Sequence, residues 1–186
     1  QRFHLPCGNL ELVLDDFTSF LANYDANERR SIFWLDYVKL GFSEFSDFMS
    51  LLDRVHDNSI IKLTLRAEPK DYFDSDPNVV AQKHRDFQQE FEEILPSWTS
   101  VPCLKFEDHA TLIQDMVRIA SQKTLPATGD RILLPLSSFC YADSVGMYTF
   151  TGIVCSKEDE KNYRKAFSKW PFANMDWNEP RIIDVP

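Results

Sequence analysis

Glycine is scarce in this sequence, which contains only five glycines in 186 residues and no G-x-G pair. Loops that wrap a phosphate group or a dinucleotide need several closely spaced glycines, and the sequence has neither a Walker loop nor a Rossmann fingerprint. The G-x-S-x-G and H-E-x-x-H patterns are also missing, and no cysteine and histidine are spaced as a nucleophile and its base. No single catalytic motif therefore identifies the chemistry.

Basic residues are also in deficit, with 20 Lys and Arg against 29 Asp and Glu, which gives a net charge of −9. No Lys/Arg run is present, so strong nonspecific binding to nucleic acid is not expected, and only a local patch could touch it. No apolar run is long enough to span a bilayer, so we expect no membrane association.

The four cysteines, Cys7, Cys103, Cys140 and Cys155, are widely separated and form no C-x-x-C pair. This spacing argues against a zinc site and against a disulfide framework, and we predict no metal ligands. Cys140 and Cys155 have apolar neighbours and are most simply reduced core residues. We therefore predict a cytoplasmic protein.

Alternating strand and helix patterns fill most of the chain. With 44% hydrophobic residues, the chain is long enough for one domain with a sizeable core. Alternation of this kind predicts an α/β fold with an open, mostly parallel sheet, closed by an antiparallel hairpin whose turn is Tyr141–Gly146. Strands are expected at residues 10–14, 31–35, 59–65, 132–136 and after 146, with a bulge or sheet edge at Pro135. Helices are expected at residues 17–24, 43–56, 79–95, 109–122 and 157–169.

Two regions follow from this pattern: an α/β domain at residues 1–170 and an extended tail at residues 171–186. The chain opens at Gln1, without Met, and enters a strand pattern at once, so we expect the domain to be incomplete at its N-terminus. Trp170, Phe172 and Trp177 lie in or beside the tail. Exposed aromatic side chains are common interface anchors, so we predict a protein partner or a homo-oligomer through this tail.

Polar side chains follow three successive predicted strands at the point where each strand ends. Asp15-Asp16 follows the first, Asp36-Tyr37 the second, and Arg66 to Glu68 the third. In open α/β sheets, ligands bind beyond the carboxyl ends of the strands. The sequence therefore predicts a binding crevice at this edge.

Three stretches carry a resemblance to a known family: SIFWLDY, SIIKLTLRAEP and FCYADSVGMYTFTGIV. Together they resemble the class I S-adenosylmethionine-dependent methyltransferase fold, and more narrowly a bacterial O-methyltransferase group. That fold has a Rossmann-like sheet in the order 3-2-1-4-5-7-6, with strand 7 antiparallel. On this mapping Leu10–Leu14 is strand 3, Ser31–Leu35 strand 4, Ser59–Leu65 strand 5, and the hairpin strands 6 and 7. The glycine-rich loop after strand 1 and the acidic residue ending strand 2 have no counterpart in this sequence.

The resemblance implies S-adenosylmethionine as cofactor and assigns two residues to it. Asp16 would accept a hydrogen bond from the adenine amino group, and Phe17 would pack against the purine ring. The alternative for Asp16 is that it caps the helix that follows, which is the commonest position for such an aspartate.

The resemblance also implies roles at the next strand ends. Asp36 and Tyr37 would be catalytic, with the carboxylate deprotonating a hydroxyl group or holding a metal. The alternative is an Asp36 bonded to backbone amides of the next loop. Arg66 and Tyr141 would bind the substrate. The alternatives are an ion pair of Arg66 with Glu68 and a purely structural role of Tyr141 in the hairpin turn.

Three functions stay open from the sequence. The first is methyl transfer to an unidentified acceptor, which makes the chain a candidate enzyme. The second is a non-catalytic scaffold or interaction module of methyltransferase-like fold, which the missing glycine loop favours. The third is another nucleotide-binding α/β enzyme. Because one fold serves many functions, fold similarity alone does not decide among them.

Overall fold

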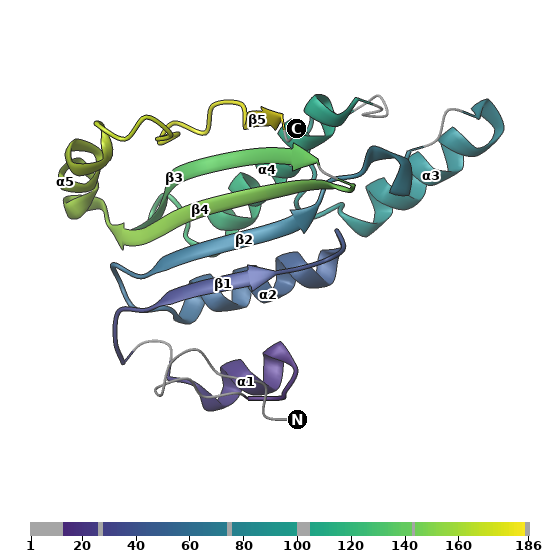
Figure 1. Ribbon diagram of the computed structural model, residues 1–186. Coiled ribbons are helices and arrows are strands. Elements are labelled where there is room, and N and C mark those ends of the chain that lie inside the picture. The colour runs from purple at the N-terminus through teal and green to yellow at the C-terminus, as the bar shows by residue number, and fades with distance from the viewer. Residues whose placement is uncertain (1–12, 26–27, 74–75, 100–104, 143, 185–186) are drawn as a thin grey trace, which may run out of the picture.

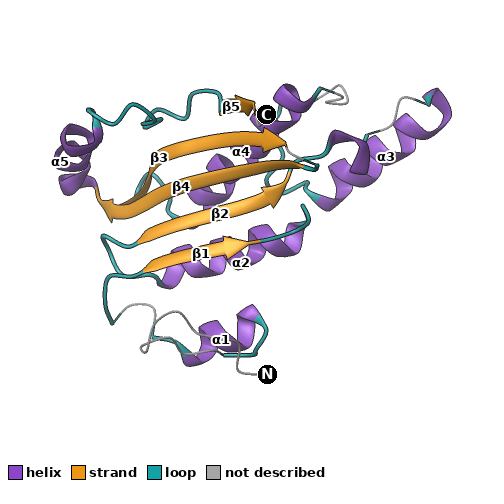
Figure 2. Ribbon diagram, viewed as in Figure 1, coloured by secondary structure: helices purple, strands orange, loops and turns teal. Residues whose placement is uncertain are grey.

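The computed structural model describes residues 13–25, 28–73, 76–99, 105–142 and 144–184. Helices and strands alternate through the first half of the chain and give way to a long hairpin (Figure 2). The helices are α1 (Phe17–Asn23), α2 (Phe42–Arg54), α3 (Pro77–Glu90), α4 (Phe106–Thr124) and α5 (Lys157–Phe167), with a 3-10 turn at Pro69–Asp71. The strands are β1 (Ile32–Asp36), β2 (Ile60–Arg66), β3 (Arg131–Ala142), β4 (Gly146–Ser156) and β5 (Arg181–Asp184).

The five strands form one sheet in the order β1-β2-β4-β3-β5 (Figure 1). β1 and β2 are parallel, as are β3 and β5, whereas β4 is antiparallel to both of its neighbours. Two strand pairs are therefore parallel and two antiparallel, so the sheet is mixed. The order β1-β2-β4-β3 is the order 4-5-7-6 that the resemblance implied, including the reversed direction of β4.

β3 is longer than expected and passes through its proline. The sequence predicts a strand at residues 132–136 with a bulge or edge at Pro135, and the β3–β4 register does shift between Pro135 and Ser137. Proline can lie here because β5 pairs with β3 only from Phe139 onward, so the missing N–H of Pro135 interrupts no ladder on that side. The predicted bulge is confirmed, within a strand that is paired on both sides farther along.

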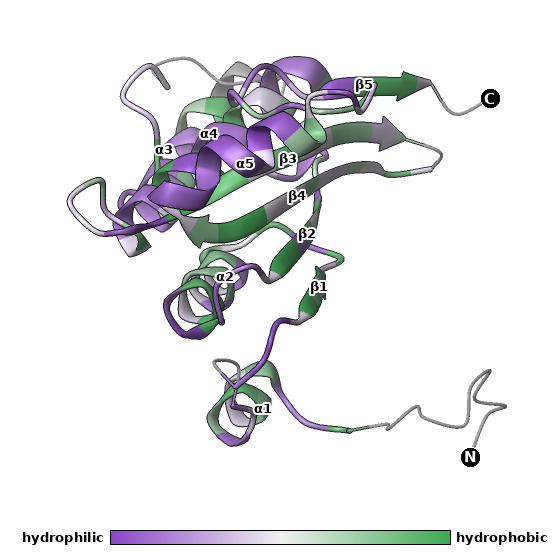
Figure 3. Cartoon of the chain, turned by 90° about the vertical axis from the view of Figure 1, so that its left-hand side faces the viewer, coloured by the Kyte–Doolittle hydropathy of each residue, from purple (hydrophilic) through white to green (hydrophobic). Residues whose placement is uncertain are grey.

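Two helices, α2 and α4, cover one face of the sheet. Figure 3 shows α2 on one side of β1 and β2, and no described helix on the other side of these two strands. The covered face carries the large core, in which Phe45, Phe48, Leu63 and Tyr148 are fully buried. On the uncovered face Ile32 and Trp34 of β1 stay 77% and 60% exposed.

α5 packs on part of this same face, across β3 and β4, and a smaller core lies beneath it. Leu134, Leu136, Ile153 and Cys155 are buried there against Tyr163 and other side chains. α5 begins where the sequence predicts it. The Ser156 hydroxyl accepts a hydrogen bond from the Asp159 amide at 3.1 Å and donates one to the Asp159 carboxylate at 2.9 Å.

Three segments differ from expectation or extend it. Val13 and Leu14 are irregular, and the rest of the predicted strand Leu10–Leu14 lies outside the described residues. α3 ends at Glu90, whereas its apolar pattern predicts a helix to residue 95. Phe91 and Ile94 are buried as that pattern predicts, but they lie in turns that follow the helix. The tail adds the short strand β5, and Trp177 stacks on Phe150 with ring centroids 5.2 Å apart.

His109 is fully buried in the large core, and neither of its ring nitrogens has a hydrogen-bond partner among the described residues. Its ring lies 5.6 Å from that of Phe73 and 6.5 Å from those of Tyr72 and Phe87. Desolvation among these aromatic rings lowers the pKa of His109 from 6.5 to about 4. The sequence predicts a helix from residue 109, and the structure places His109 near the start of α4 with its side chain in the core.

We predict that His109→Phe removes part of the acid sensitivity of folding. Below pH 6.5 the unfolded chain binds a proton at His109 and the folded protein does not, so stability falls as pH drops from 6.5 to 4. The loss from this group is about 3 kcal/mol, at about 1.4 kcal/mol for each pKa unit. Urea unfolding at pH 7 and pH 4 measures it, with His56→Phe as control. Equal acid-induced losses in His109→Phe and in the unmodified protein would contradict the prediction.

Candidate functional site

The predicted crevice corresponds to the edge of the sheet where β1 and β2 end. β1 ends at Asp36 and β2 at Arg66, and the backbone amide of Tyr37 continues the ladder by donating to the Thr64 carbonyl at 3.0 Å. Because β4 runs the opposite way, its first residue, Gly146, reaches the same edge. The start of β4 therefore lies beside the end of β2.

Glu68 fixes this hairpin turn to the end of β2. Its carboxylate accepts a hydrogen bond from the Gly146 amide at 3.0 Å, and the Ala67 amide donates to the Gly146 carbonyl at 2.7 Å. Lys70 lies 2.8 Å from the same carboxylate, and these contacts, led by the Lys70 hydrogen bond, lower the pKa of Glu68. A Cβ atom on Gly146 would lie 2.6 Å from the Phe106 ring and 2.9 Å from Glu68, so the close approach requires glycine.

Asp36, Arg66 and Tyr141 lie on the uncovered face of the sheet at this edge. Arg66 is opposite Met147, which is opposite Tyr141, so these three residues form one row across β2, β4 and β3. Asp36 belongs to the preceding row, opposite Thr64. The structure thus brings three of the six predicted residues to one face. Arg66 bonds to Asp71, at 3.2 Å from its Nη2, and not to Glu68 as the ion-pair alternative had it.

Tyr37 turns to the covered face, although it follows Asp36 directly. Its hydroxyl donates to the Asp47 carboxylate on α2 at 2.8 Å. Burial, followed by the hydrogen bond to Asp47, raises the pKa of the Tyr37 phenol well above its usual range. Burial also raises the pKa of Asp47, and the Tyr37 hydroxyl acts against that rise. Tyr37 and Asp47 therefore form a half-buried pair that holds the end of β1 against α2.

Phe17 and Asp47 line the same hollow between α1 and α2, which has a volume of about 290 Å³. Asp16 is near enough for its charge to raise the pKa of Asp47. Asp16 itself caps α1, because its carboxylate accepts from the Ser19 amide at 2.9 Å and from the Ser19 hydroxyl at 2.8 Å. These bonds lower the pKa of Asp16, and the capping alternative is therefore the one that the structure shows for it.

Polar contacts on the uncovered face of the sheet were not predicted from the sequence. The Trp34 indole N–H donates to the Thr64 hydroxyl at 3.2 Å, and the Thr64 and Thr149 hydroxyls are 3.3 Å apart. The Lys62 ammonium lies 3.9 Å from the Trp34 ring centroid. Strand alternation places Trp34, Lys62 and Thr64 on one face, but only the pairing register shows that they touch.

Neither a metal cluster nor a membrane-spanning helix appears in the described part of the chain. No group of three or more His, Cys, Asp or Glu side chains there is arranged to hold a metal ion. None of the helices described combines the length and the hydrophobicity that crossing a bilayer requires. Cys140 and Cys155 are buried free thiols, as the sequence predicts, and Cys7 and Cys103 lie outside the described residues.

The mixed α/β sheet with a reversed β4, and polar residues at the ends of β1 and β2, has the arrangement expected of a methyltransferase-like protein. A family model described as Putative O-methyltransferase matches residues 1–186, the whole of the chain. The chain therefore belongs to that family, which confirms the resemblance drawn from the three sequence stretches. No curated protein matches it significantly.

We predict that Gly146→Ala destabilises the protein by about 1–3 kcal/mol, because the added methyl group must displace Phe106 or Glu68. It should also raise the pKa of Glu68, since the hydrogen bond from the Gly146 amide to the Glu68 carboxylate weakens. Urea unfolding and NMR titration of Glu68 measure the two effects. Gly129→Ala is the matched control, because its Cβ would meet only the Pro126 carbonyl, at 3.3 Å. Equal effects of the two substitutions would contradict the role of the close approach.

We predict that Tyr37→Phe costs about 1 kcal/mol of stability, the usual contribution of one partly buried hydrogen bond. The pKa of Asp47 should rise further, because the variant lacks the hydroxyl that stabilises its charged form. NMR titration of Asp47 reads this out. Tyr141→Phe is the control, and an unchanged Asp47 pKa in Tyr37→Phe would show that the bond is not formed in solution.

Proposed function

We propose that the protein transfers a methyl group from S-adenosylmethionine to an oxygen atom of an acceptor that is still unidentified. The observation that carries the proposal is the strand order β1-β2-β4-β3 with β4 reversed, together with membership of the O-methyltransferase family. A chain of this kind would act in the cytoplasm.

Asp36 is the strongest candidate for a catalytic role. It is exposed at the end of β1, on the same face as Arg66 and Tyr141, where an acceptor could lie across the strand ends. A carboxylate placed there can orient an acceptor hydroxyl group and take its proton. Tyr37 is less suited to this step, since its phenol is bonded to Asp47 and its pKa is raised. Its role is to position the end of β1.

The cofactor would supply an activated methyl group, and the described residues fit one part of it. Asp16 is exposed, and a carboxylate with two bonds to Ser19 still has lone pairs for an adenine amino group. Phe17 packs against the large core beside α2, so its ring is less available to the purine. Methyl transfer depends mainly on in-line placement of donor and acceptor, so few named residues are needed.

A non-catalytic scaffold is the second candidate function. No described glycine has a positive φ, and Gly41, Gly146 and Gly152 each face close neighbours that pack against them. None of these three forms a cofactor cradle. Ile32 and Trp34 are exposed beside the edge of β1 with which no described strand pairs, and they would instead suit a partner protein. Trp170 and Phe172 are also exposed, whereas Trp177 is stacked on Phe150 and is not an available anchor.

Calorimetric titration of S-adenosylhomocysteine into the whole native protein separates these two functions. If the protein is a methyltransferase, we expect micromolar binding that Asp16→Ala weakens about tenfold, the effect of losing one hydrogen bond to a charged group. Asp36→Ala should leave this affinity within about twofold and abolish methyl transfer in an acceptor screen. Asp130→Ala, an exposed carboxylate, is the control. Absence of binding to the whole native protein would reject the enzyme in favour of the scaffold.

A further inference from the structure

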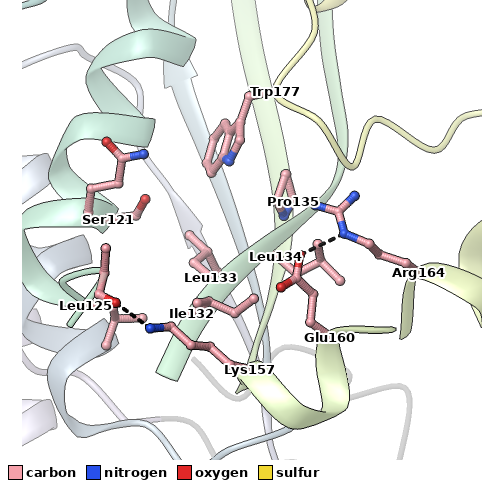
Figure 4. A pocket seen from close by; sticks show the side chains of 12 residues that line it. Ser121, Leu125, Ile132, Leu133, Leu134, Pro135, Lys157, Glu160, Arg164 and Trp177 are labelled. Atoms are coloured by element: carbon pink, nitrogen blue, oxygen red, sulfur yellow. Dashed lines mark hydrogen bonds and ion pairs between the residues drawn. The ribbon is translucent and has the colours of Figure 1, made fainter. Parts of the chain in front are cut away.

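A cavity of about 240 Å³ lies at the opposite end of the sheet, between α4, β3 and α5 (Figure 4). Leu125, Ile132 and Leu133 give it an apolar floor, and Trp177 closes one side. β3 runs from this cavity to the hairpin turn near Glu68, so the cavity lies about 30 Å from the predicted crevice, at 3.3 Å for each strand residue. It is separate from the proposed methyl-transfer site and independent of it.

Trp177 is held in place as a wall of this cavity. One face of its indole stacks on Phe150, with an angle of 4° between the ring planes. Its backbone has φ 55°, a left-handed conformation that is strained for a bulky side chain. Gln114 stabilises it by donating to the Trp177 carbonyl at 3.2 Å, and the Asn178 amide donates to the Asn174 side chain at 2.9 Å. Strained backbone held in this way is frequent at ligand clamps.

The charges at the mouth of the cavity leave one cation without a carboxylate partner. Arg164 is neutralised, since it contacts Glu160 at 2.7 Å and Asp176 at 2.8 Å. Lys157 donates to the Ala127 carbonyl, and in the described parts of the chain its ammonium makes no ion pair. A backbone carbonyl does not cancel a full positive charge, so Lys157 would favour an anionic group at the rim.

We propose that this cavity binds a monocyclic aromatic carboxylate. The ring would lie against Trp177 over the apolar floor, and the carboxylate would reach the Lys157 ammonium. The size fits, because an apolar cavity of about 150 Å³ holds benzene, and 240 Å³ leaves room for a carboxylate as well. An apolar lining with an aromatic side chain and a few polar groups is the common composition of small-ligand sites.

Benzoate titration of the whole native protein, followed by NMR and calorimetry, tests the proposal. We expect millimolar or tighter binding with shifts confined to Trp177, β3, α5 and the C-terminal end of α4. The neutral analogue benzyl alcohol and the non-aromatic cyclohexanecarboxylate should each bind at least fivefold more weakly. Lys157→Gln should weaken benzoate about tenfold, and Lys165→Gln, an exposed lysine on the same helix, should not. Trp177→Phe should keep binding within about threefold, and Trp177→Leu should abolish it.

Three results would overturn the proposal. Equal binding of benzoate and benzyl alcohol would remove the role of the charge. Lys157→Gln and Lys165→Gln could have the same effect, which would show nonspecific attraction. Failure of benzoate to bind at all would leave the cavity as a packing feature. Because both lysines are exposed, these substitutions should not unfold the protein.

Discussion

The antiparallel insertion of β4 between β2 and β3 is the constraint on which the rest of the structure depends. β4 pairs with seven residues of β2 and runs along nearly all of β3. Its alternation sends Tyr148 and Phe150 into the large core and Ile153 into the small one, so the strand joins both cores. A slip of one residue would exchange these faces and expose both sets. The same register places Gly146 beside Glu68, and therefore fixes the hairpin turn at the edge that carries the candidate site.

The predicted site residues at the end of β1 lie on two opposite faces of the sheet. Asp36 and Tyr37 are neighbours in the chain, yet their side chains lie on opposite faces, because successive residues of an extended strand alternate. Asp36 shares the uncovered face with Arg66, while Tyr37 joins Asp47 on the covered one. The two side chains therefore do not converge on one side of the sheet. On the proposed function, acceptor chemistry would lie on the uncovered face, and the Tyr37–Asp47 pair holds β1 and α2 together.

Local patterns in the sequence predicted the elements that local physics determines. The predicted start of α5 coincides with the Ser156–Asp159 cap, the predicted bulge lies beside Pro135, and the predicted hairpin turn precedes Gly146. Contacts between distant residues escaped prediction, since periodicity carries no information about register. The Glu68–Gly146 bond joins residues 78 apart, and Asp47 looks like any polar residue of an amphipathic helix. β5 was hidden for the same reason, because its pairing with β3 depends on how the tail turns after α5.

The left-handed backbone positions show how this chain differs from one built around a glycine loop. In the described residues φ is positive at Asn58 and Trp177, and at no glycine. The described glycines instead include Gly146 and Gly152, where a Cβ would collide with neighbouring side chains. Gly146 and Gly152 thus permit close packing at β4. The strained left-handed conformation occurs instead at Trp177, which lines the cavity. Strain at Trp177 must be offset by its stacking on Phe150 and by the Gln114 bond, which ties the tail to α4 and β4. Contacts between distant residues therefore fix the chain at both ends of the sheet, through Glu68 at one end and Trp177 at the other.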